Sequence, residues 1–135
     1  MSSLQGSCLC GSVRYALHSL PTGGRYCHCA YCRKFSGSAH GAWAMVDKAD
    51  FALTQGEELV CEYDSGHGLR CFCATCGSPV CFRSKDYPII GIPLGALDEH
   101  AADLSVPAPE KHIWMQSNPA WHTVSDTLPQ LDRNE

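Results

Sequence analysis

Short stretches in which apolar and polar residues alternate run along most of the chain, and polar or glycine-rich breaks separate them. In the first stretch, Val13, Tyr15 and Leu17 alternate with polar or small residues, which is the period of a half-buried β-strand. Further strands are expected at residues 42–46, 51–54, 59–63, 69–73 and 78–82. Helical periodicity is weak, and short helical turns are expected only near residues 31–36 and 98–104. The pattern is therefore compatible with a mainly β chain.

Proline and glycine mark where these strands should turn or bend. Pro21-Thr-Gly-Gly24 predicts a turn, and residues 87–97, which are apolar but interrupted by two prolines and two glycines, favour a bent strand. No repeat, low-complexity tract or linker divides the 135 residues, so a single domain spanning residues 1–135 is expected. The tail after Pro129 is expected to be loose.

The composition argues against several classes of protein. The longest uncharged apolar stretch, Pro88–Leu97, is too short and too rich in proline and glycine to cross a bilayer. Residues 1–8 have neither the basic nor the apolar region of a signal peptide, so a cytoplasmic location is expected. A net charge of −4, with only ten Lys and Arg residues, argues against a surface that binds nucleic acid.

The unusual feature of the composition is its ten cysteines, most of which are clustered. Five disulfides would account for an even number, but disulfides persist in oxidising compartments and nothing in the sequence directs export. Thiols two or three residues apart also point into one small volume, which suits a shared metal ion better than bridges between distant strands. Zinc is therefore expected at the three clusters, which are Cys8-x-Cys10, Cys27-x-Cys29-x-x-Cys32 and Cys73-x-x-Cys76.

The seven clustered thiols divide most naturally into four and three. Four thiolates leave zinc no vacancy and form a structural site, whereas three leave one position for water or substrate. Cys73-x-x-Cys76-Gly77 should be a metal-binding turn in a hairpin, where Gly77 can adopt the positive φ that a tight loop requires. This turn supplies two ligands. From the spacing alone, either Cys8-x-Cys10 or part of the middle cluster could complete the set.

Three segments around the clusters, Gly6–Tyr15, Cys27–Gly37 and Arg70–Val80, resemble the family of glutathione-dependent formaldehyde-activating enzymes, whose domain is shared with centromere protein V. Later landmarks extend the likeness over about residues 6–128. The resemblance implies small coiled β-sheets in an Mss4-like zinc-binding fold. It also implies two zinc ions per chain, a structural zinc held by Cys8, Cys10, Cys73 and Cys76 and a catalytic zinc held by Cys27, Cys29 and Cys32.

The resemblance further implies a carbon–sulfur lyase that joins glutathione and formaldehyde into S-hydroxymethylglutathione. A thiol that enters the vacant position of the catalytic zinc would lose its proton and become a nucleophile at neutral pH. No motif selects glutathione over another small thiol, or formaldehyde over another aldehyde, and none indicates an oligomeric state. Two alternatives stay open: a noncatalytic zinc module that binds proteins, and a glutathione carrier that accelerates no reaction.

Residues beside the clusters have less specific roles. Arg33 and Lys34 could offset the negative charge of the site, although solvated surface charge is the commoner role of such pairs. His28 is expected to point away from the metal, and His40 or His67 would close the second site only if one supplied a fourth ligand. Packing in or at the rim of the core is expected for Cys61, Cys71, Cys81, Trp43, Trp114 and Trp121.

Overall fold

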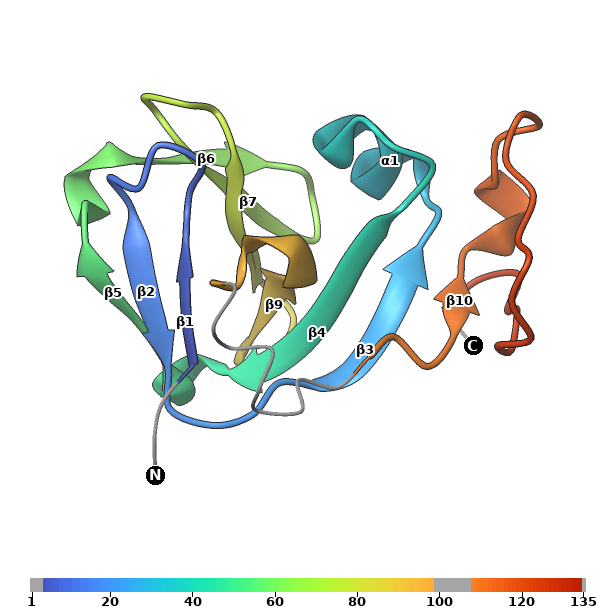
Figure 1. Cartoon of the computed structure of the whole chain (residues 1–135), viewed down its shortest axis with the longest axis horizontal. Helices are drawn as coiled ribbons and strands as arrows, with labels where there is room; N and C mark the ends of the chain where they lie inside the picture. The colour runs from blue at the N-terminus through green and yellow to red at the C-terminus, as the bar shows by residue number, and fades with distance from the viewer. Residues whose placement is uncertain (1–3, 99–107, 135) are drawn as a thin grey trace.

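The structure is a computed structural model that describes residues 4–98 and 108–134, and two β-sheets make up most of it (Figure 1). A three-stranded sheet has the order β1-β2-β5, and a seven-stranded sheet has the order β10-β3-β4-β9-β8-β7-β6. Every pairing is antiparallel except the one between β10 and β3. The prediction of a mainly β chain built from small sheets is confirmed.

Most strands lie close to where the alternating pattern places them. The strands are β1 (Leu4–Ser7), β2 (Arg14–Leu17), β3 (Thr22–Cys27), β4 (Gly41–Asp47), β5 (Phe51–Gln55), β6 (Val60–Asp64), β7 (Gly68–Cys73), β8 (Pro79–Ser84), β9 (Ile89–Pro93) and β10 (His112–Ile113). The helix predicted near residues 31–36 is α1 (Ala30–Ser36), which Gly37 ends in the left-handed conformation. Short 3₁₀ turns occupy Lys48–Asp50, Glu57–Leu59, Leu94–Ala96 and Met115–Ser117.

The turn predicted at Pro21–Gly24 is wrong, because β3 already begins at Thr22. The register of β3 against β4 shifts between Thr22 and Arg25, and Gly23 has a φ of +66°. The two glycines therefore accommodate a bulge inside a strand, a conformation that uses the same backbone freedom as a turn.

The loose tail predicted after Pro129 is also wrong. The backbone N–H of Leu131 donates to His112 O at 2.9 Å, and the N–H of Trp114 donates to Arg133 O at 2.9 Å. The tail thus pairs with backbone groups in and beyond β10 that would otherwise lack partners. Of the turn predicted at residues 98–104, only Asp98 lies within the described residues, and it is not helical.

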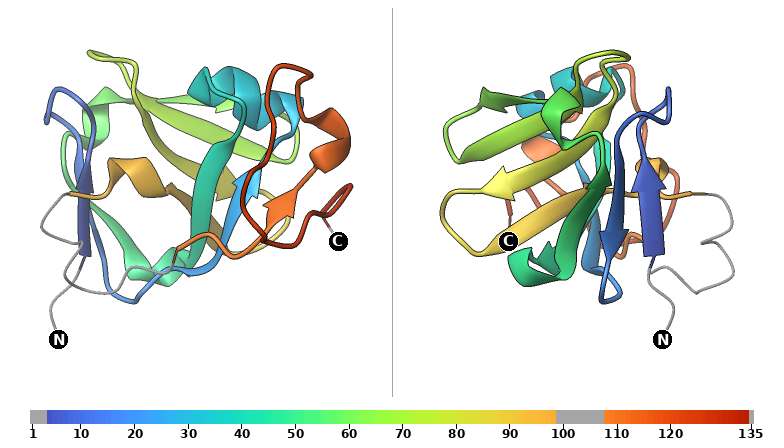
Figure 2. Two further views of the ribbon diagram at one scale, coloured as in Figure 1. Left: turned by 45° about the vertical axis from the view of Figure 1, so that its right-hand side comes forward. Right: turned by 90° about the vertical axis from the view of Figure 1, so that its left-hand side faces the viewer.

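Two apolar clusters form the core. The larger lies between the small sheet and strands β7 to β9, and the strands of the small sheet run across those of the larger one in the right-hand view of Figure 2. The smaller surrounds Cys27 and Cys32 and includes Trp43 and Ile113, which places two of the candidate metal ligands inside a packed region. Within the described residues, no helix has the length and apolarity needed to cross a membrane.

Candidate metal centres

Four cysteine side chains from two distant segments meet at the end of the β7–β8 hairpin. Cys8 and Cys10 come from the loop after β1, Cys73 ends β7, and Cys76 lies in the turn before β8. All four Sγ atoms lie within 4.8 Å of one another, with 3.6 Å between Cys8 and Cys10 and 3.9 Å between Cys10 and Cys73. A tetrahedral zinc ion with Zn–S bonds of about 2.3 Å separates its sulfurs by about 3.8 Å. The donor set therefore fits a zinc ion.

The loops around this first cluster direct backbone N–H groups at sulfur. The N–H of Val13 lies 3.2 Å from Cys8 Sγ, and the N–H of Thr75 lies 3.4 Å from Cys73 Sγ. Gly77 has the positive φ that the sequence predicts, +76°, and its N–H donates to Cys73 O at 2.8 Å. The N–H of Val13 favours the thiolate of Cys8, but burial outweighs it and raises the pKa of this thiol, so a bound metal ion is what would keep the sulfur deprotonated.

The second cluster lies where β3 meets α1. Cys27 ends β3, Cys29 caps the N-terminus of α1 and Cys32 lies in its first turn, so that the three Sγ atoms come within 4.8 Å of one another. Cys29 Sγ accepts the backbone N–H of Cys32 at 3.4 Å. Hydrogen bonds from the Cys27 and Cys32 thiols and from backbone N–H groups lower the pKa of Cys29. Cys27 and Cys32 are buried and Cys29 is half-buried, so the cluster can be approached from the side of Cys29.

Among the residues that the structure describes, no His, Cys, Asp or Glu joins the second cluster to make a set of four. His67 is exposed and lies 3.5 Å from Asp86, and His40 packs against the rings of His28 and His122. Neither histidine supplies the fourth ligand that the sequence analysis considered. The structure thus brings together the same sets of four and three cysteines that the resemblance implies.

A positive charge beside the second cluster comes from Arg70 on β7, which the sequence analysis did not single out. Its Nη1 and Nη2 atoms lie 3.9 and 3.7 Å from Cys32 Sγ. Arg33 is half-buried and Lys34 is exposed, and neither donates a hydrogen bond to a cysteine sulfur in the described part of the chain. The alternation of β7 could have indicated that Arg70 faces away from buried Cys71, but not which distant segment it meets.

Four histidines in the described part of the chain pack together beside the second cluster, and two of them are buried. His28 and His112 are 0% and 2% exposed. The Asp126 carboxylate can only accept, so His112 Nε2 carries a proton toward it at 3.0 Å, and His112 Nδ1 accepts the Nε2–H of His28 at 2.9 Å. Burial beside His40 and His112 lowers the pKa of His28 to about 4, so this ring is neutral at pH 7. The hydrogen bond to His112 holds the ring of His28, and His28 does not belong to the second cysteine set, as the sequence predicts.

We expect His112→Phe to destabilise the fold by about 1–3 kcal/mol, because a buried donor on His28 and the Asp126 carboxylate both lose their partner. Urea unfolding of the metal-loaded protein measures this loss. His67→Phe is the matched control, since His67 is exposed. Equal unfolding midpoints for the two variants would contradict a structural role for the hydrogen-bond chain.

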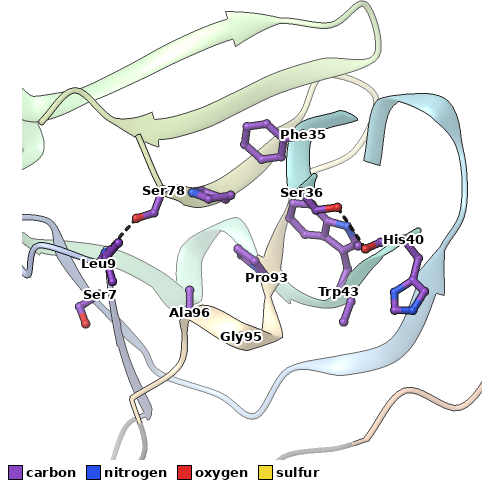
Figure 3. Close-up of a pocket in the computed structure, with 13 residues that line it drawn as sticks. Ser7, Leu9, Phe35, Ser36, His40, Trp43, Ser78, Pro93, Gly95 and Ala96 are labelled. Carbon is purple, nitrogen blue, oxygen red and sulfur yellow. Dashed lines mark hydrogen bonds between the residues drawn. The ribbon is translucent and has the colours of Figure 1, made fainter. Parts of the chain in front are cut away.

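A cavity of about 410 Å³ is lined by residues next to both cysteine clusters in sequence. Figure 3 shows Phe35 and Trp43 on one side of it, Leu9 and Ser78 on the other, and Pro93 between them. Of the described residues in its wall, His40 alone is titratable, so these residues offer no permanent cation to the carboxylates of a molecule such as glutathione. The cavity is lined by Ser7, Leu9, Phe35, Ser36, His40, Gly41, Ala42, Trp43, Ser78, Pro79, Pro93, Gly95 and Ala96.

The packing expected for the remaining cysteines and tryptophans is observed in part. Cys71 and Cys81 face each other across β7 and β8 and are fully buried, whereas Cys61 is half-buried. Trp43 is buried in the smaller core cluster, but Trp121 is 72% exposed, so its expected packing is wrong.

Comparisons with known proteins identify the family of this chain. The sequence profile of glutathione-dependent formaldehyde-activating enzymes matches residues 3–117. The chain belongs to this family. A Halomonas elongata protein, provisionally named a glutathione-dependent formaldehyde-activating enzyme, is 29% identical over an alignment of 127 residues, and the match covers 87% of this chain and 78% of that protein. A crystal structure of a Rhodobacter sphaeroides protein superposes with a TM-score of 0.61 at 25% identity, over 78% of this chain and 97% of that one. Membership supports glutathione-dependent activation of formaldehyde at the level of the family.

Proposed function

We propose that this protein is a zinc-dependent enzyme of the carbon–sulfur lyase type, which joins a small thiol to formaldehyde or a related aldehyde. The family supports glutathione as the thiol and S-hydroxymethylglutathione as the product. The proposal rests on the unequal number of sulfur donors in the two clusters. Among the described residues, the first cluster has four and the second has three. Four sulfurs saturate a zinc ion, and three leave room for a substrate. We place the reaction in the cytoplasm, where the thiols stay reduced.

The three cysteines of the second cluster would hold the catalytic zinc, and the four of the first cluster would hold the structural one. A zinc ion held by three thiolates supplies a free coordination position and lowers the pKa of a thiol that enters it. Buried Cys27 and Cys32 keep water from the inner side of the cluster, and Cys29 borders the side from which a substrate arrives. The substrate thiolate adds to the carbonyl carbon, the π electron pair moves to oxygen, and the oxygen takes a proton from solvent.

The two alternative functions predict different behaviour of the second cluster. A noncatalytic module that binds proteins needs a second site that is closed or absent, whereas the described residues provide three donors. A glutathione carrier needs the same open site as an enzyme, so geometry does not separate these two. Because thiols and formaldehyde also combine spontaneously, only the dependence of the rate on protein concentration distinguishes catalysis from binding.

We therefore expect the initial rate of S-hydroxymethylglutathione formation to rise linearly with the concentration of zinc-loaded protein, above the spontaneous rate. Stopped-flow or exchange NMR measurements at several protein concentrations test this expectation. A rate independent of protein, together with stoichiometric glutathione binding, would indicate a carrier. Protein that binds neither glutathione nor 2-mercaptoethanol would indicate a noncatalytic module.

A further inference from the structure

We infer that Arg70 makes the open side of the second cysteine cluster selective for an anionic ligand, a substrate thiolate, over a neutral one. The inference rests on the proposed function, in which a thiol reaches the metal held by Cys27, Cys29 and Cys32. It assigns a specificity-determining role to a side chain that lies far from these cysteines in sequence.

Aromatic rings from two elements hold the guanidinium of Arg70 in place. Its Cζ atom lies 5.3 Å from the ring centroids of Phe35 and Phe82 and 5.9 Å from that of Tyr31. Phe82 is the residue directly opposite Arg70 in the β7–β8 pair. Tyr31 and Phe35 are four residues apart and therefore share a face of α1. Cation–π contacts on several sides restrict the side chain to the neighbourhood of α1.

The guanidinium is also directed at sulfur. Both Nη atoms face Cys32 Sγ, at 3.9 and 3.7 Å, and no carboxylate among the described residues forms an ion pair with Arg70. Its buried Nε atom has no hydrogen-bond partner. An arginine carries five N–H donors, and only Nη donors contact Cys32, so these contacts leave part of the donors of Arg70 unused. Arg83, in contrast, forms an ion pair, because its Nε lies 3.6 Å from Glu62 Oε2.

The charge of the loaded site explains what Arg70 contributes. A divalent zinc ion with three thiolates carries one negative charge, and a fourth thiolate raises this to two. A neutral fourth ligand such as imidazole leaves the charge unchanged. A fixed cation beside Cys32 therefore stabilises the thiolate complex more than the imidazole complex, by a Coulomb term that falls with distance.

The test measures the affinities of two ligands for protein whose second site is loaded with cobalt(II). The visible absorption of the cobalt ion reports the binding of each ligand. The thiol probe is 2-mercaptoethanol, which has no carboxylate, and the neutral probe is imidazole. We expect Arg70→Gln to weaken thiol binding about tenfold while imidazole binding changes about twofold or less. Arg70→Lys, which keeps the charge, is expected to recover most of the thiol affinity.

Arg83→Gln is the matched control, because Arg83 is also half-buried and lies 5.8 Å from an aromatic ring centroid, that of Phe51, but its Nε pairs with Glu62 and not with a cysteine of the second cluster. It should leave the ratio of thiol to imidazole affinity unchanged. An unchanged ratio in Arg70→Gln would overturn the inference while leaving the proposed function standing. So would an Arg70→Gln protein that cannot be loaded with metal at the second site, since Arg70 would then act on the cysteines and not on the incoming ligand. Wild-type protein that binds no thiol would overturn both.

Discussion

Cys73→Ser is expected to leave the chain unfolded or aggregated, with no metal ion at the first cluster. Cys73 is fully buried at the end of β7, and it joins the hairpin to Cys8 and Cys10 from a loop more than sixty residues away. A serine hydroxyl is a poor ligand for zinc, which prefers thiolate and imidazole donors. In zinc-finger peptides a structural zinc ion contributes about 10–16 kcal/mol, which is as large as the whole stability of a typical domain. Far-ultraviolet circular dichroism, size-exclusion chromatography and zinc content measure the loss.

The control for this variant is Cys61→Ser, which also exchanges a thiol for a hydroxyl. Cys61 lies on β6, is half-buried and belongs to neither cluster. It should therefore fold and bind metal like the wild type. A Cys73→Ser protein that is folded and still holds its full complement of metal would show that the first cluster is not a structural zinc site.

The local features of the fold follow from short-range pattern in the sequence. Alternation places β2, β4 and the β7–β8 hairpin within a residue or two, because one face of each strand must be apolar. Cys73-x-x-Cys76-Gly77 predicts both the turn and the positive φ of its glycine, since few other residues adopt that conformation. The grouping of seven thiols into four and three follows from the coordination number of zinc.

The features that the sequence analysis missed depend on contacts between distant segments. Arg70 meets Cys32 only because the fold brings residue 70 of β7 close to α1, and no local pattern around residue 70 indicates that pairing. Likewise, the segment after Pro129 resembles a free tail until its backbone is seen to pair with His112. At Gly23 the error has another cause, because a bulge and a turn require the same positive φ. Such features need the tertiary structure.

In contrast to Cys73→Ser, Cys29→Ser is expected to fold, to keep the metal of the first cluster and to lose that of the second, together with thiol binding and catalysis. Cys29 has two roles, as a sulfur donor and as the N-cap of α1, where its Sγ accepts the N–H of Cys32. Serine is among the best N-cap residues, so the substitution removes the metal ligand and preserves the cap. Metal content per chain, glutathione titration and the initial-rate assay measure the three losses.

Cys29→Ala separates the two roles of Cys29, because alanine provides neither a ligand nor a cap. We expect it to be less stable than Cys29→Ser by about 1 kcal/mol in urea unfolding, while both variants lack the second metal ion to the same extent. If Cys29→Ser instead unfolds as Cys73→Ser does, both clusters are structural, and the proposed open site has no support. If it keeps full activity, the reacting thiol does not bind at the second cluster. The proposal thus requires that the two clusters respond differently to the loss of a single sulfur, as expected when one ion is saturated by the protein and the other is not.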